Sequence, residues 1–92
     1  MAKATVTEPA FVASLIAALR QKFSGAEVSY EHVRGIRYRF IVQWDHFDSL
    51  GHPERQKQVW KIAEEALGKA DLLNVSMILT LSRSDVEVEK TL

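Results

Sequence analysis

IRYRFIVQW–DHFDSLGHPE–RQKQVWKIAEEAL, from Ile36 to Leu67, is the stretch that decides the fold of this 92-residue chain. Its first nine residues alternate, which is typical of a β-strand with one buried face and one wet face. One face would carry Ile36, Tyr38, Phe40, Val42 and Trp44, and the other Arg37, Arg39, Ile41 and Gln43. A polar turn follows, and then Pro53 and Glu54 open an amphipathic helix that Gly68 ends. The predicted buried stripe of this helix comprises Val59, Ile62, Ala63, Ala66 and Leu67.

A second helix is predicted before this stretch, from Pro9 to Phe23. Its apolar residues recur every four positions, as on one face of an α-helix: Phe11, Leu15, Leu19 and Phe23. The segment from Ala26 to Val33 alternates and predicts a strand, and Arg34-Gly35 predicts a turn. So short a connection favours an antiparallel hairpin with the strand that begins at Ile36.

A third strand is predicted after the central helix, from Leu73 to Leu81. It alternates Leu73, Val75, Met77, Leu79 and Leu81 with Asn74, Ser76, Ile78 and Thr80. The order helix–strand–strand–helix–strand predicts one α+β domain over residues 1–92, with a small mixed three-stranded sheet and helices packed on one face. We expect residues 1–6 and 88–92 to be flexible. Within the tail, Ser84 and Glu87 are spaced to cap a terminal helix, whereas Val86 and Val88 are compatible with another strand.

Composition restricts the classes of function. Twelve basic and twelve acidic residues cancel, so the chain lacks the cationic excess that gives nonspecific affinity for nucleic acid or anionic membranes. No cysteine is present, which excludes disulfides, thiolate metal sites and a cysteine nucleophile and suits a reducing compartment. The apolar run Ala10–Leu19 is too short to span a bilayer and is followed directly by Arg20. We therefore predict a cytoplasmic protein without membrane contact.

No residue pattern indicates catalysis or a cofactor. The chain shows no nucleophile–base pair, glycine-rich phosphate loop or paired carboxylates, and we predict that it is not an enzyme. Only three histidines are available as metal ligands, namely His32, His46 and His52. They are weak candidates, because a metal site needs three or four converging ligands. His46 and His52 flank the polar turn, and we interpret them as residues exposed to solvent.

Arginines on the polar face of the central strand suggest a different kind of site. Arg37 and Arg39 could contact single-stranded nucleic acid beside stacking aromatics. The aromatic residues of that strand alternate with the arginines, however, and so lie on its other face. A solvated strand face is therefore the alternative interpretation.

The spacing of Phe47, Arg55 and Val59 resembles that of a phenylalanine, a helix-opening arginine and an aliphatic residue in BolA-like proteins. In that family an aromatic strand leads through F-x-G and a short spacer into R-H-R and a helix, and then to a C-terminal strand. The resemblance covers about residues 8–87. It implies a fold like that of class II KH domains, with residues 45–62 as the contact edge, although Gly51-His52-Pro53-Glu54 lacks the second glycine of a G-x-x-G loop.

The chain also departs from the BolA pattern. Gln56 follows the arginine where the family has histidine, Ser49 replaces the F-x-G glycine, and Asn74 stands at the position of the C-terminal histidine that ligates an iron–sulfur cluster shared with a monothiol glutaredoxin. Asparagine does not replace imidazole on iron. The resemblance therefore predicts a divergent member that binds no cluster and for which a glutaredoxin is not the expected partner.

Three functional hypotheses result. The first is a non-enzymatic regulatory or adaptor domain that contacts a protein or a nucleic acid, with five basic residues as the candidate contacts: Arg37, Arg39, Arg55, Lys57 and Lys61. The second is an iron–sulfur module with a glutaredoxin, using His32 with His46 or His52. The third is an interaction domain that forms a homodimer through a strand edge or the flank around Trp60.

Overall fold

The computed structural model describes residues 9–85. The expected flexibility of residues 1–6 and 88–92 and most of the predicted tail, including Glu87, lie outside these residues. Seven elements follow one another: α1 (Ala10–Lys22), β1 (Glu27–Arg34), β2 (Arg37–Gln43), the 3-10 helix η2 (Asp45–Ser49), α2 (His52–Ala66), α3 (Lys69–Leu72) and β3 (Val75–Leu81). A helical turn at residues 83–85 comes after β3. The predicted order of two helices and three strands is confirmed, and η2 and α3 add two short helices to it.

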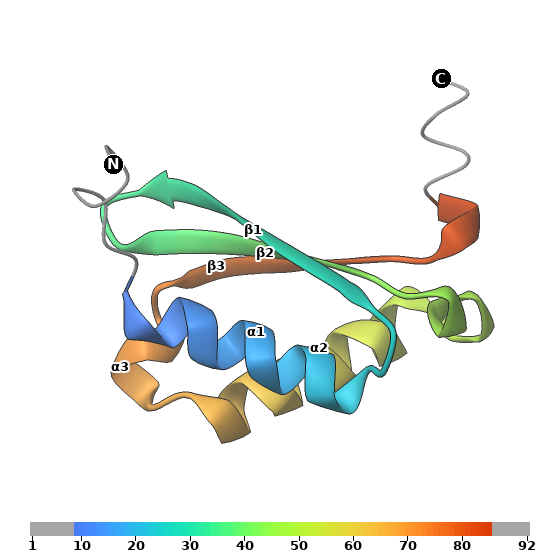
Figure 1. Cartoon of the computed structure of the whole chain (residues 1–92), viewed down its shortest axis with the longest axis horizontal. Coiled ribbons are helices and arrows are strands. Elements are labelled where there is room, and N and C mark those ends of the chain that lie inside the picture. The colour runs from blue at the N-terminus through green and yellow to red at the C-terminus, as the bar shows by residue number, and fades with distance from the viewer. Residues whose placement is uncertain (1–8, 86–92) are drawn as a thin grey trace.

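The three strands form one sheet in the order β1-β2-β3. β1 pairs antiparallel with β2, whereas β2 pairs parallel with β3, so the sheet is mixed as predicted. Figure 1 shows α1 and α2 beneath one face of the sheet, and α1, α2 and α3 all leave the opposite face uncovered. The domain thus has two layers. No helix in the described part of the chain has the length and apolar character needed to cross a membrane.

The core lies between this sheet and α1 and α2. Phe40, Val42, Leu15 and Leu19 are completely buried, because the apolar stripe of α1 meets the apolar face of β2. The four residues predicted at every fourth position are all buried, since Phe11 and Phe23 are buried as well, and Phe23 lies directly after the last residue of α1. In α2 the stripe is narrower than predicted: Ala66 is exposed, although Val59, Ile62, Ala63 and Leu67 are buried.

Strand β3 departs from simple alternation. Tyr38 pairs with Val75, but the next residue of β2, Arg39, pairs with Met77, so Ser76 is an extra residue in β3. A one-residue insertion of this kind reverses which side chains face inward beyond it. Val75 is buried before the irregularity and Ile78 and Thr80 after it. The apolar residues of the predicted strand therefore do not share one face, and Met77 and Leu79 point to the open side of the sheet.

Several boundaries differ from the sequence prediction. β2 begins at Arg37 and ends at Gln43. Ile36, which the alternation assigned to the buried face of this strand, lies instead in the β1–β2 turn and is 58% exposed. The third strand begins at Val75 and not at Leu73, because Leu73 is the C-terminal cap of α3. The terminal helical turn is capped at Ser82: the backbone N–H of Asp85 donates to Ser82 Oγ at 3.2 Å, and the N–H of Ser82 donates to Asp85 Oδ2 at 3.0 Å. This reciprocal pair is a capping box, two residues earlier than the Ser84–Glu87 pair that the sequence suggested.

Candidate functional site

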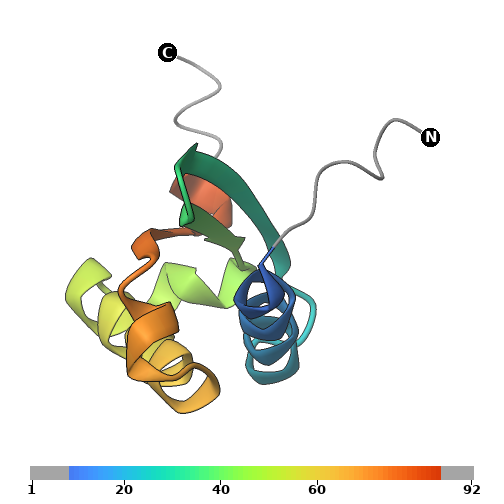
Figure 2. The same ribbon diagram turned by 90° about the vertical axis from the view of Figure 1, so that its left-hand side faces the viewer.

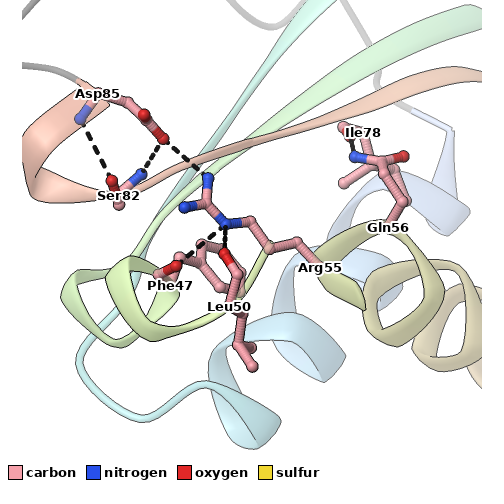
Figure 3. Close-up of polar contacts among 7 residues, drawn as sticks. All are labelled: Phe47, Leu50, Arg55, Gln56, Ile78, Ser82 and Asp85. Atoms are coloured by element: carbon pink, nitrogen blue, oxygen red, sulfur yellow. Dashed lines mark hydrogen bonds and ion pairs between the residues drawn. The ribbon is translucent and has the colours of Figure 1, made fainter. Parts of the chain in front are cut away.

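Arg55 lies at the start of α2 and is only 5% exposed. Its Nε donates to the carbonyl oxygens of Phe47, at 3.1 Å, and of Leu50, at 2.9 Å. Its Nη1 donates to Asp85 Oδ2 at 2.8 Å, as Figure 3 shows. The guanidinium also lies 5.6 Å from the centre of the Phe47 ring. We call Phe47, Leu50, Arg55, Ser82 and Asp85 the Arg55 cluster.

The electrostatics of this cluster favour the charged form of Asp85. Hydrogen bonds from Ser82 and from the Arg55 guanidinium lower the pKa of Asp85 to about 2. The ion pair joins α2 to the turn after β3, and the two carbonyl bonds join α2 to η2. Arg55 therefore connects three segments that are separate in the sequence.

The position of Arg55 corrects its predicted role. It was a candidate contact residue, but its guanidinium is buried and three of its possible hydrogen bonds are made within the domain. Local sequence patterns do not indicate this burial, because an arginine at the start of a helix is ordinarily a solvated charge.

Gln56 is also engaged within the domain. Its Nε2 donates to the carbonyl oxygen of Ile78 at 2.8 Å, and its Oε1 accepts from the indole N–H of Trp60 at 3.1 Å. Because β3 is an edge strand, Gln56 occupies a carbonyl that the sheet would otherwise leave free. The flank around Trp60, a candidate dimer contact, is thus partly buried and hydrogen-bonded to its own helix.

The four remaining candidate cations do not form one surface. Arg37 and Arg39 alternate with the core residues of β2 and so point to the open face of the sheet. Lys57 and Lys61 are exposed on α2, which covers the other face. Arg39 moreover forms an ion pair with Glu31, on the neighbouring strand. The structure therefore separates the predicted cations into two pairs on opposite sides of the sheet.

The three histidines are separated as well. His32 lies opposite Tyr38, where β2 begins, and its Nε2 is 2.6 Å from the carbonyl oxygen of Gly35. His46 is in η2, after the other end of β2, and His52 begins α2. Within residues 9–85, no group of three or more histidine, aspartate or glutamate residues is placed to hold a metal ion.

Most of the exposed large apolar side chains lie at one end of the sheet, whereas Leu79 lies farther along β3, opposite Ile41. Sequence reasoning missed this feature. Among the described residues, five large apolar side chains are exposed: Val33 (50%), Ile36 (58%), Leu73 (76%), Met77 (45%) and Leu79 (39%). Val33 is the last residue but one of β1, and Ile36 lies in the β1–β2 turn. Leu73 immediately precedes Asn74, whose carbonyl oxygen accepts from the N–H of Tyr38 at 2.9 Å. The turn and the start of β3 therefore lie at the same end, which faces the viewer in Figure 2.

We call this region the hairpin-end surface and define it by six residues: Val33, Arg34, Ile36, Arg37, Leu73 and Met77. Arg34 and Arg37 are directly opposite each other across the turn, and both are exposed. The β-bulge at Ser76 contributes to the surface, because it places Met77 beside Arg39 on the open face. The alternation of residues in the sequence alone could not reveal that the bulge turns Met77 to the open face.

A polar cavity of about 430 Å³ lies at the opposite end of the sheet. Its lining combines carboxylates, cations and an indole: Ser24, Gly25, Glu27, Gln43, Trp44, Asp45, His46 and Arg83. The indole N–H of Trp44 is already used, since it donates to the Ser24 carbonyl oxygen at 2.9 Å. Charges of both signs line this cavity, and the predicted contact arginines, Arg37 and Arg39, are not part of it.

Comparison of the chain with protein-family models, with curated proteins and with solved structures gives no significant match.

Proposed function

We propose that this chain is a divergent BolA-like adaptor domain, with a class II KH-like fold, that works by binding a protein and not by catalysis. Two observations support kinship with that family. The element order and mixed sheet agree with those that the resemblance implies. In addition, Phe47, Arg55 and Val59, which carry the resemblance, are all buried, and Arg55 bonds to the Phe47 carbonyl. A buried cluster of the same three residues in BolA-like proteins would be a physical reason for the same spacing along the sequence.

The binding function is inferred from how the exposed apolar side chains and the cations are distributed over the surface. The five exposed large apolar side chains of the described chain lie on the hairpin, at the end of α3 and on β3. Exposed apolar side chains grouped with arginine are typical of protein interfaces. The cations, by contrast, are divided between two faces, and the aromatics of β2 face the core. A nucleic-acid groove requires cations that converge along a backbone, with accessible aromatic faces for single strands.

The cluster-binding hypothesis has less support. His32 and Asn74 both flank Tyr38 at the hairpin end, where the resemblance would place the two ligand positions. Asparagine is not a ligand for iron in proteins of this kind, and His32 Nε2 is within hydrogen-bond distance of Gly35. We therefore prefer an adaptor that contacts its partner through side chains and not through a shared metal cluster.

The proposal is tested by comparative affinity capture. The immobilised wild-type domain should retain a specific protein from a native extract, whereas Ile36→Asp should lose it, because the substitution puts a charge into the exposed apolar group. The matched control is Gln58→Asp, at a position of α2 on the other side of the sheet, which should retain the protein. A gel-shift titration with single- and double-stranded oligonucleotides at low salt supplies the second arm. Saturable oligonucleotide binding at micromolar domain, together with capture that Ile36→Asp leaves unchanged, would refute the proposal.

A further inference from the structure

The β1–β2 turn carries two arginines that face each other. Arg34 and Arg37 are cross-strand partners, and like charges directly opposite each other on a sheet are destabilising. Within residues 9–85, neither has a carboxylate within ion-pair distance, whereas Arg39 is paired with Glu31. The free domain therefore holds two exposed arginines on paired backbone positions, without a neutralising carboxylate among its described residues.

We propose that the hairpin-end surface binds an acidic protein segment, with a carboxylate of the partner lying between Arg34 and Arg37 and its apolar side chains covering Val33, Ile36 and Leu73. This inference rests on the proposed adaptor function and specifies the chemistry of the partner. A carboxylate placed there relieves the repulsion between the two guanidinium groups and gains two charge-assisted hydrogen bonds.

The apolar component favours a protein over a nucleic acid as the source of the negative charge. Leu73, Ile36 and Val33 are 76%, 58% and 50% exposed, and aliphatic side chains gain most from contact with other apolar side chains. They offer no flat face on which a base could stack. Two arginines are also few, since the affinity of nucleic-acid binders depends on cations that neutralise many phosphates.

Charge also argues against a second copy of this chain at the same surface. A two-fold contact pairs each surface patch with itself. It would therefore bring two Arg34–Arg37 pairs together and add repulsion across the interface. An acidic partner removes repulsion that is already present, so the surface is complementary to a different protein.

The turn is held in place before any partner binds. Gly35 has φ of +58°, a left-handed conformation that suits glycine. His32 Nε2 is 2.6 Å from the Gly35 carbonyl oxygen, and the His32 ring lies 5.1 Å from that of Tyr38. These contacts fix the ends of the turn on which Arg34 and Ile36 are carried. A preformed surface reduces the entropy lost on binding.

The test uses the full-length, ¹⁵N-labelled chain and three labelled twelve-residue peptides. The first alternates leucine with glutamate, the second replaces each glutamate with glutamine, and the third replaces each with lysine. We expect the acidic peptide to shift the backbone amide signals of residues 33–37 and 73, and to bind at least about tenfold more tightly than the glutamine peptide. No shift up to about 1 mM acidic peptide, or equal binding of the first two peptides, would overturn the inference.

Two double variants locate the contact. Arg34→Glu/Arg37→Glu should weaken binding of the acidic peptide about tenfold or more, because it replaces two attractive pairs with repulsion. Lys57→Glu/Lys61→Glu changes the net charge by the same amount on the opposite side of the sheet and should change affinity less than about twofold. Equal losses in the two variants would show a nonspecific charge effect and would overturn the inference.

The captured protein separates this inference from the proposed function. If Ile36→Asp loses the captured protein while Arg34→Glu/Arg37→Glu retains it fully, the acidic-partner inference fails and the adaptor proposal stands. If the domain captures no protein and binds oligonucleotides, the adaptor proposal is wrong, and the acidic-partner inference that rests on it is wrong as well. Loss of the protein in both variants, with retention in the Lys57→Glu/Lys61→Glu control, is the result expected here.

Discussion

Replacing Arg55 by methionine is the most informative perturbation of the fold. Methionine keeps most of the aliphatic volume but removes the charge and every donor. The Leu50 carbonyl oxygen loses the hydrogen bond that it accepts from Arg55 Nε at 2.9 Å. Asp85 loses its cationic partner, Arg55 Nη1, which lies 2.8 Å from Asp85 Oδ2. The Phe47 carbonyl oxygen is less affected, because it also accepts from the N–H of Leu50 at 3.0 Å.

The expected cost of Arg55→Met follows from these contacts. Hydrogen bonds that involve a charged group contribute about 1.5–3 kcal/mol each, and the loss of one partner from a buried pair costs about 3–5 kcal/mol. The side chain of Asp85 is 32% exposed, so water can partly replace the guanidinium. We therefore expect the free energy of unfolding to fall by about 3 kcal/mol, which lowers the melting temperature of a domain of this size by about 12–24 °C.

Urea unfolding followed by tryptophan fluorescence measures this change, since Trp44 and Trp60 are both partly buried. Lys57→Met is the matched control: it makes a similar exchange at an exposed position of α2, and we expect an effect within about 0.5 kcal/mol. A double-mutant cycle with Asp85→Asn should give a coupling energy of about 1–2 kcal/mol. A loss below about 1 kcal/mol for Arg55→Met, or a coupling near zero, would refute the structural role of the cluster.

Three further predictions concern single residues. Asp85 has a folded pKa of about 2, below its ordinary 3.8, so its stabilising contribution is complete above about pH 4 and is lost as the pH falls toward 2. The difference in unfolding free energy between wild type and Asp85→Asn, about 1–2 kcal/mol at pH 7, should disappear near pH 2; an unchanged difference would contradict this pKa. Thr80 is 1% exposed, and its Oγ1 has no hydrogen-bond partner among the described residues, so Thr80→Val should raise the melting temperature or leave it unchanged. A clear decrease in calorimetry would reveal an unrecognised bond of that hydroxyl. Gly35→Ala should destabilise the domain by about 1 kcal/mol because of the positive φ, and Gly35→Asn by less; equal urea midpoints for the two variants would count against the left-handed turn.

The helices and the central strand could be predicted because their signals are local. In α1, apolar residues at every fourth position form one stripe whatever packs against it, and Leu15 and Leu19 are indeed buried. In β2, strict alternation assigns Phe40 and Val42 to one face and Arg39 to the other before any neighbour is known. The turn glycine Gly35 is also a local signal, since few residues other than glycine adopt that backbone conformation.

The candidate site was predicted only in part, because its chemistry depends on register and burial. Arg37 was correctly placed on the open face of the sheet, but its opposition to Arg34 appears only once β1 and β2 are paired. The sequence showed Leu73 and Met77 as ordinary members of a third strand, whereas α3 and the bulge at Ser76 leave both exposed. Arg55 was expected on a contact surface and is instead buried.

By itself, the sequence determined the element order, the inner face of α1 and β2 and the α+β class, because periodicity and turn residues act over a few neighbouring positions. Only the tertiary structure decided which polar residues are buried in contacts within the domain and which exposed apolar residues lie together on the hairpin-end surface. Arg55 is buried because η2 and the turn after β3 both close on the start of α2. The hairpin-end surface exists because parallel pairing of β2 with β3 brings Leu73 to the same end of the sheet as Ile36. Both outcomes arise from contacts between segments that are distant in the chain, and local patterning carries no information about such contacts.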